Sequence, residues 1–231
     1  MIQAVLFDFY DTLGKIQTER VLAARRELAH RAGVPEEAFF DAWRATFQAR
    51  SLGQLGPLEQ ELATVLGQLG RILPQEQLTA LADFERATWR AAVQLYPDTR
   101  PTLAVLRQQG LRLGLVSNCS CQAAEAIRSL GLAALLDTLV LSCEVGILKP
   151  DPGIYLRACE DLGVAPSACA FVGDGGSQEL RGAYTLGMLT LRLERAGERN
   201  DLAVGQPYHY HLTTLDQVST VLASAQHPGP P

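Results

Sequence analysis

Short apolar segments alternate with helical segments in the second half of the chain, and this alternation restricts the fold more than any other feature. The apolar segments lie at 111–118, 137–142, 168–174 and 188–193, and residues 208–215 lead into a last helix that ends near Ala225. Helical segments of about ten to fifteen residues separate them, and strands connected in this way pair in parallel through right-handed crossovers. The sequence therefore predicts a parallel β-sheet covered by helices.

One further strand is expected near the N-terminus, where the apolar residues 4–7 stop at Asp8. The long segment that follows contains no convincing strand, and we expect four helices there, at 21–33, 35–53, 57–70 and 74–95. Three of them begin at a proline and three end at a glycine, as is typical of helix termini. The N-terminal strand is thus separated from the other strands by an inserted helical segment.

We therefore expect an α/β fold with a doubly wound parallel sheet, formed by residues 1–15 and 97–225. Residues 16–96 are expected to form an α-helical cap over the carboxyl ends of the strands, and residues 226–231 a disordered tail. Ligand sites favour strand ends and domain interfaces. The sequence accordingly predicts a pocket between the cap and the core.

Composition and charge exclude several classes of partner. The chain has 231 residues, 47% of them hydrophobic, a net charge of -5 and no run of lysine or arginine, so neither a nucleic acid nor a membrane surface is expected as a partner. No apolar stretch reaches the ~20 residues of a membrane span, and the first strand begins too early for a removable leader. The five cysteines are irregularly spaced, which argues against a disulfide framework. We expect a cytoplasmic monomer or homodimer.

Polar residues with catalytic potential follow four of the predicted strands. They are Asp8, Thr12, Ser117, Asn118, Lys149, Asp174 and Glu179. Carboxylates that converge at one edge of the sheet repel each other, and a hard divalent cation such as Mg²⁺ removes that repulsion. We expect Lys149 to neutralise a nucleophilic carboxylate, and Ser117 and Asn118 to contribute with it to binding a small anionic substrate.

These strand ends carry four motifs in a fixed order: DFYDT from Asp8, SN from Ser117, KPDPGIY from Lys149 and GDGGSQE from Gly173. In this order the sequence resembles the haloacid dehalogenase superfamily of hydrolases over nearly its whole length, and the KPDPGIY segment is the most specific part of the match. The resemblance implies that Asp8 is a nucleophile that forms a covalent intermediate.

The resemblance also implies a magnesium ion held by Asp8, the backbone carbonyl of Tyr10 and Asp174. Glu179 either completes the ligand set or, as we favour, positions Lys149 or metal-bound water. Arg44, Arg50 or another arginine of the cap is a candidate to bind a substrate anion, but nothing in the sequence selects one.

Tyr10 departs from the pattern of the superfamily's phosphatases, which usually have at this position an aspartate that protonates the leaving group and activates water. Acid/base catalysis contributes about 10²–10⁴-fold in rate. Its loss hinders the hydrolysis of alkyl phosphates, whose leaving alkoxide is poor, more than that of aryl or acyl phosphates. The superfamily's 2-haloacid dehalogenases also have an aromatic residue here, and displacement of halide needs no proton.

Three hypotheses follow from these residues. The first is a Mg²⁺-dependent phosphatase that is weak or selective for good leaving groups. The second is a metal-independent 2-haloacid dehalogenase, and the third is a binding or regulatory protein with little activity, since fold does not fix function. We favour the phosphatase, because Asp174 and Glu179 beside an anionic substrate make little sense without a metal ion.

Overall fold

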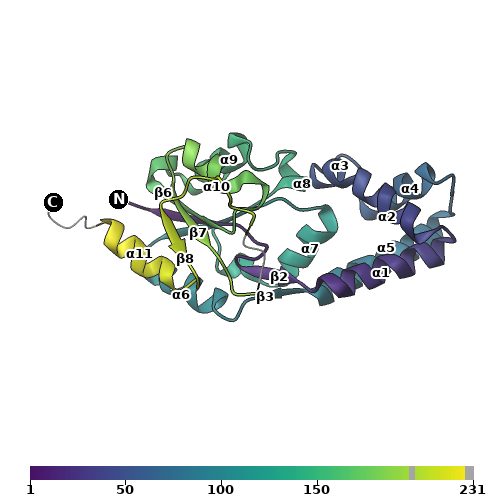
Figure 1. Ribbon diagram of the computed structural model, residues 1–231, viewed down its shortest axis with the longest axis horizontal. Helices are drawn as coiled ribbons and strands as arrows, with labels where there is room; N and C mark the ends of the chain where they lie inside the picture. The colour runs from purple at the N-terminus through teal and green to yellow at the C-terminus, as the bar shows by residue number, and fades with distance from the viewer. Residues whose placement is uncertain (198–200, 227–231) are drawn as a thin grey trace.

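The computed structural model describes residues 1–197 and 201–226, which form an α/β core and a lobe of helices at one end of an elongated molecule (Figure 1). A six-stranded sheet runs through the core in the order β5-β4-β1-β6-β7-β8, and all of its described pairings are parallel. The strands are β1 (Ala4–Phe7), β4 (Arg112–Ser117), β5 (Thr138–Leu141), β6 (Cys169–Gly173), β7 (Leu189–Leu193) and β8 (Tyr210–Leu212).

Helices cover both faces of this sheet. They are α6 (Thr99–Gln108), α7 (Cys121–Ser129) and α11 (Gln217–Gln226) on one face, and α9 (Pro152–Leu162) and α10 (Glu179–Thr185) on the other. In β1, Val5 and Phe7 pack in the cluster that contains residues of α6, α7 and α11, whereas Ala4 and Leu6 pack in the cluster that contains residues of α9 and α10. A strand buried on both faces reads as a continuous apolar run, and the predicted doubly wound parallel sheet is confirmed.

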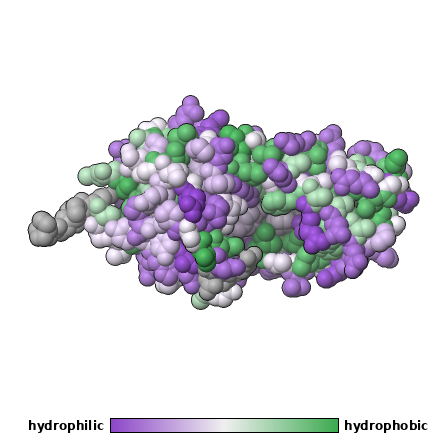
Figure 2. Space-filling model, turned by 45° about the horizontal axis from the view of Figure 1, so that its top comes forward, coloured by the Kyte–Doolittle hydropathy of each residue, from purple (hydrophilic) through white to green (hydrophobic). Residues whose placement is uncertain are grey.

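The lobe of helices, here called the cap, follows β1 and a short loop in the chain. It consists of α1 (Thr18–Ala32), α2 (Glu36–Ala45), α3 (Phe47–Ser51), α4 (Leu58–Gln68) and α5 (Gln75–Ala92). The cap has a hydrophobic cluster of its own, in which Phe39 and Trp43 stack with their ring centroids 5.7 Å apart. On the face shown in Figure 2, small hydrophobic and hydrophilic patches are interspersed over both lobes.

Two predictions for the helical segment were wrong. The helix expected at 35–53 breaks at Thr46 into α2 and α3. The helix expected at 74–95 ends at Ala92, and β3 (Val93–Leu95) follows, paired antiparallel with β2 (Gly14–Ile16). A strand of three residues shows too little alternation to be recognised in a sequence, and here it is fixed by its pairing with the other chain segment that joins cap to core.

The remaining elements are short connections. They are α8 (Ser142–Val145) and the 3₁₀ turns Leu132–Ala134, Pro166–Ala168 and Gly176–Gln178. Gly53, at the end of α3, lies against the carbonyl of Cys143 in α8 so closely that a Cβ atom would overlap it. The side chain of Ser142 donates to the carbonyl of Ser51 at 2.7 Å, so the cap also contacts the core at α8.

The C-terminal end of the chain differs from expectation at one residue. Gln226, predicted as the start of a disordered tail, is the last residue of α11, and residues 227–231 lie outside the described residues. None of the helices in the described ranges combines the length and the hydrophobicity of a membrane span.

Candidate active site

Asp8 lies at the carboxyl edge of the sheet because β1 ends one residue before it. Phe7 pairs with Leu115 of β4 and with Val172 of β6, and the backbone amide of Asp8 continues the ladder by donating to the carbonyl of Val172 at 2.9 Å. The ends of the two neighbouring strands therefore flank Asp8, which is 5% exposed. Burial at the centre of the sheet holds this carboxylate in one place.

Lys149 connects two acids of the site. Its Nζ atom lies 2.5 Å from Oδ1 of Asp8 and 2.5 Å from Oε2 of Glu179, and the three side chains are 3%, 7% and 1% exposed. Burial by itself lowers the pKa of Lys149, but the two carboxylates outweigh it and raise the pKa above its usual range. Lys149 is therefore a charged ammonium that orients Asp8.

The side chain of Asn118 holds the backbone of Lys149 in place. Its Oδ1 atom accepts from the Lys149 amide at 2.8 Å, and its Nδ2 group donates to the Lys149 carbonyl at 3.1 Å. Asn118 was predicted to bind substrate, but both ends of its amide are engaged with this peptide. Its geometry is that of a residue that positions Lys149.

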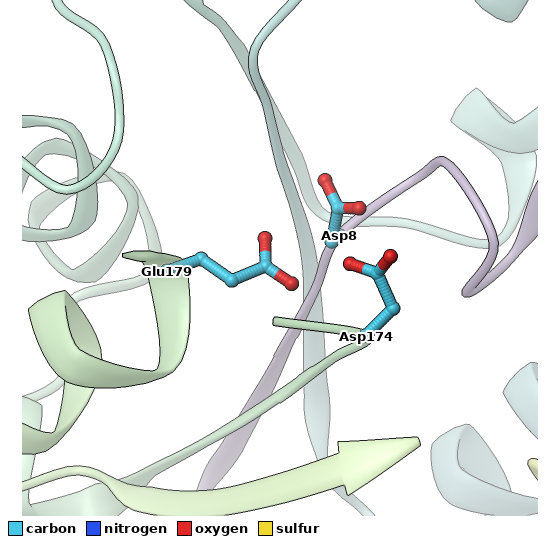
Figure 3. Close-up of side chains that lie close together, drawn as sticks. All are labelled: Asp8, Asp174 and Glu179. Atoms are coloured by element: carbon cyan, nitrogen blue, oxygen red, sulfur yellow. The ribbon is translucent and has the colours of Figure 1, made fainter. Parts of the chain in front are cut away.

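Three acids face one another at the strand ends, as Figure 3 shows: Asp8 after β1, Asp174 after β6 and Glu179 at the start of α10. One oxygen of each lies within 4.8 Å of the others. Burial, followed by the negative charge of Asp8, raises the pKa of both Asp174 and Glu179. The cluster thus holds more negative charge than Lys149 neutralises.

The hydrogen bonds of these acids separate them into two kinds. Both oxygens of Glu179 are engaged, Oε2 with Lys149 and Oε1 with the amide of Gly175 at 3.0 Å. Asp174 uses Oδ1 to accept from the amide of Gly176 at 2.8 Å. The second oxygens of Asp8 and Asp174 accept from no amide or ammonium group in the described part of the chain, so these two atoms are available to a cation.

The donor set fits magnesium. Mg²⁺ is bound through oxygen atoms and typically uses one or two carboxylates together with substrate phosphate and water, and Asp8 and Asp174 supply two carboxylate oxygens that accept from no amide or ammonium among the described residues. The loop adds a further oxygen, because the carbonyl of Phe9 accepts from three amides of the turn whereas that of Tyr10 accepts none of the turn's hydrogen bonds. Asp8, Asp174 and Glu179, which the sequence predicts as metal ligands, lie close together. Glu179 differs from the other two because both of its oxygens are engaged, one of them with Lys149.

The ring of Tyr10 packs edge-on against Phe9, with centroids 5.1 Å apart, and lines the cavity between core and cap. Burial, and next to it nearby negative charge that includes Asp8, raises the pKa of Tyr10 well above its usual value. The phenol is therefore neutral at physiological pH, and it cannot act as a general base.

Two hydroxyl groups of the site have no partner in the described structure. The Oγ atoms of Thr12 and Ser117 are buried and make no hydrogen bond. Buried hydroxyls without a partner are uncommon in folded proteins. They are suited to donate to the oxygens of a bound anion, the role that the sequence predicted for Ser117.

Sequence reasoning missed the residues that hold the catalytic loops. Arg195 donates to the carbonyl of Thr12 at 2.6 Å and pairs with Asp98 at 3.0 Å, and Gln206 donates to the carbonyl of Gly175 at 2.6 Å. Arg195 and Thr12 are 183 residues apart in the chain. No sequence signal links them, because only the folded chain brings them together.

A cavity of about 770 Å³ lies between the core and the cap, next to these acids. The core contributes Tyr10, Asn118 and Ser177 to its wall, and the cap contributes Arg25, Trp43 and Arg50. The cap end of the cavity wall is therefore basic, whereas its core end carries neutral polar side chains.

The chain matches the haloacid dehalogenase-like hydrolase family over residues 2–184, and it belongs to that family. A glyceraldehyde 3-phosphate phosphatase of Methanopyrus kandleri is 33% identical over 210 residues, which cover 87% of this chain and 88% of the relative. The (S)-2-haloacid dehalogenase 1 of Pseudomonas sp. (strain CBS-3) is 27% identical, with 96% of each chain covered.

The crystal structure of a 2-haloacid dehalogenase from Pseudomonas syringae pv. Tomato DC3000 superposes with a TM-score of 0.76 at 26% identity, covering 97% of this chain and 100% of that one. The predicted superfamily and the prediction of a hydrolase are confirmed. Because the relatives include both phosphatases and dehalogenases, the choice between the two activities has to be argued from the residues of the site.

Proposed function

We propose that this protein is a Mg²⁺-dependent phosphatase that hydrolyses a small phosphorylated metabolite through a covalent intermediate on Asp8. The observation that carries the proposal is the acid cluster, in which Asp8 and Asp174 each keep one oxygen that accepts from no amide or ammonium among the described residues, while three carboxyl groups share the single ammonium of Lys149. A displacement of halide needs no such excess of carboxylate.

The reaction consists of two displacements at phosphorus. In the first, an oxygen of Asp8 bonds to phosphorus, the bond to the leaving oxygen breaks, and the leaving alkoxide takes a proton from solvent. In the second, water bonds to phosphorus, the bond to Asp8 breaks, and phosphate leaves as the water gives up its proton. Lys149 holds Asp8 in place, and the hydroxyls of Thr12 and Ser117 donate to the phosphoryl oxygens.

Asp8, Asp174 and the Tyr10 carbonyl would hold magnesium, which would supply positive charge beside the phosphoryl group. Glu179 serves the reaction indirectly, because its two oxygens hold Lys149 and the Gly175 amide. Without that contact Lys149 would lose one of its two anionic partners.

Tyr10 determines which substrates react well. A neutral phenol with a raised pKa is a weak proton donor and no base, so the rate depends on how readily the leaving group departs without a proton. We therefore expect aryl and acyl phosphates to react faster than alkyl phosphates.

A 2-haloacid dehalogenase is the second candidate, and Tyr10 is the observation that favours it. There Asp8 would displace halide from carbon to form an ester, which water then hydrolyses, and neither step requires Asp174. A binding protein with little activity is the third candidate. A cytoplasmic location and a monomeric or dimeric state remain predictions from the sequence.

One experiment separates the three. Purified protein and its Asp8→Asn variant are assayed on an aryl phosphate, an alkyl phosphate and 2-chloropropionate, each with Mg²⁺ and with a chelator. We expect Mg²⁺-dependent release of phosphate, fastest from the aryl ester and abolished in the variant. Chelator-resistant release of chloride would replace the phosphatase with the dehalogenase, and no release from any substrate would favour the binding protein.

A further inference from the structure

The cap end of the cavity contains charged residues that the proposed chemistry does not use. Arg25 and Arg50 both lie against Trp43, with their guanidinium carbons 5.2 and 4.3 Å from the centroid of its ring. Arg50 is 4% exposed and Trp43 is 2% exposed. All three residues line the cavity that also contains Tyr10 and Asn118.

These cavity-lining residues offer hydrogen-bond donors that have no acceptor. Arg25 Nε and Trp43 Nε1 are buried and make no hydrogen bond within the described structure. Arg50 uses Nε to donate to Thr46 and Nη2 to donate to the Trp43 carbonyl, and its Nη1 group has no acceptor among the described residues. An orphaned buried donor costs free energy, so Arg25 Nε and Trp43 Nε1 beside one cavity point to a ligand that supplies acceptors.

Two acids lie close to the arginines. Glu85 lies 3.9 Å from Arg25, and Glu61, which is fully buried without a hydrogen bond, acts on Arg50 through its charge. Neither acid belongs to the cavity wall. Burial raises the pKa of Glu61 to about 8 and lowers that of Arg50 to about 10, so at neutral pH the arginine is charged and the acid is mostly neutral.

We propose that Arg25, Arg50 and Trp43 form a subsite for a carboxylate, so that the substrate is a phosphate ester carrying a carboxylate at its other end. The reacting group in this inference rests on the proposed function, whereas the carboxylate rests on the cap residues alone. A carboxylate matches the site because its two oxygens can accept from the two orphaned donors, Arg25 Nε and Trp43 Nε1, beside the charge of Arg50.

Arg44 lines the same cavity but has a different environment. Its side chain is 76% exposed and is paired with Asp41. An exposed, paired arginine contributes little to binding. The structure therefore selects Arg25 and Arg50 among the arginines of the cap, a choice that the sequence left open.

The subsite is tested by binding, without turnover. The probes are 4-phosphonobutyrate, which has a carboxylate and a phosphonate that cannot be hydrolysed, and butylphosphonate, which lacks the carboxylate. Binding in the presence of Mg²⁺ is measured by calorimetry and by tryptophan emission, since both tryptophans of the chain line the cavity. We expect 4-phosphonobutyrate to bind at least about tenfold more tightly, the effect of one charge-assisted hydrogen bond.

Arg25→Gln is the test variant, because Arg25 makes no hydrogen bond within the described residues and its ion pair with Glu85 is long, at 3.9 Å. Arg26→Gln is the matched control, since Arg26 is the next residue of α1, 53% exposed and paired with Glu36. Arg25→Gln should abolish the advantage of the carboxylate, and Arg26→Gln should keep it. Arg50→Lys, which keeps the charge but not the planar fork, should reduce it.

Each result bears on the inference separately from the phosphatase. Equal affinity for the two probes, an equal effect of the two glutamine variants, or no binding of either probe would overturn the carboxylate subsite. Tighter binding of butane-1,4-diphosphonate than of 4-phosphonobutyrate would overturn the preference for a carboxylate. If only 4-phosphonobutyrate binds, and does so through Arg25, the subsite stands while the proposed phosphoryl site fails.

Discussion

Asp174→Asn and Glu179→Gln remove one negative charge each from the same cluster, and we expect them to have opposite consequences for magnesium. Each amide keeps an oxygen where the carboxylate accepts a backbone hydrogen bond, from Gly176 for Asp174 and from Gly175 for Glu179. Asp174 has a further oxygen available to a cation, whereas both oxygens of Glu179 are engaged. Comparing the two variants therefore distinguishes a metal ligand, Asp174, from a residue that positions Lys149, Glu179.

The magnitudes follow from linkage. A ligand at a hundredfold excess over its dissociation constant stabilises the folded protein by about 2.7 kcal/mol, and at this chain length 1 kcal/mol corresponds to about 2–4 °C in melting temperature. Wild-type protein should therefore melt about 5–10 °C higher with saturating Mg²⁺. Asp174→Asn should lose most of this shift, and Glu179→Gln should keep it.

The metal-free proteins should differ as well. Burial and the charge of Asp8 raise the pKa of Asp174, so holding it ionised at pH 7 costs stability in the folded state, and the neutral asparagine should be at least as stable as wild type. Glu179→Gln puts an amide NH2 group where Oε2 accepts from Lys149, so this charge-assisted hydrogen bond is lost at a cost of about 1.5–3 kcal/mol, with and without Mg²⁺ alike.

Thermal melts of the three proteins at pH 7, in chelator and over a range of MgCl₂ concentrations, measure these differences. CaCl₂ and NaCl at matched ionic strength control for screening. If Glu179→Gln loses the magnesium shift as completely as Asp174→Asn, then Glu179 is a ligand and the division between the two acids is wrong. If wild type shows no shift, the metal site itself is refuted.

Two further predictions concern Tyr10 and the cap. Tyr10→Asp should raise the rate on an alkyl phosphate by up to about 10²-fold and change the rate on an aryl phosphate little. Steady-state assays on both esters would measure these rates. An equal change on both esters would exclude a role of residue 10 in protonating the leaving group. Because the pKa of Glu61 is raised by burial from 4.5 to about 8, the unfolded chain releases this proton first, and wild-type stability should fall as pH rises between these values. Glu61→Gln should flatten this pH dependence of the free energy of unfolding and should be more stable than wild type by at least about 1 kcal/mol at pH 9. Urea titrations from pH 5 to 9 measure both effects. Parallel profiles of unfolding free energy against pH for the two proteins would contradict a buried neutral Glu61.

The sequence by itself determined the sheet and its catalytic edge. Buried parallel strands read as apolar runs such as residues 4–7, and each run ends where the chain leaves the hydrophobic core. The residues after these ends, Asp8, Ser117 and Asp174 among them, must meet at one edge because parallel strands all point the same way. Local pattern and topology are sufficient for that inference.

Only the tertiary structure determined which role each residue of the site has. Asn118, Lys149 and Glu179 were each candidates for several roles. Their roles can be assigned only from distances, because a carboxylate oxygen 2.5 Å from an ammonium already has a partner, whereas an oxygen without such a partner can bind a cation. The sequence placed these residues at the same edge but could not say which oxygen faces which partner.

The arginines of the cap show most plainly what cannot be predicted from the sequence. Its helices were readable from their apolar spacing and their prolines, yet Arg25, Arg44 and Arg50 are equivalent in a sequence. Packing alone makes one of them exposed and paired with Asp41 and leaves the other two against Trp43. The specificity proposed here depends on which donors are buried without acceptors. Burial is a property of contacts between segments distant in the chain, so only the folded structure determines it.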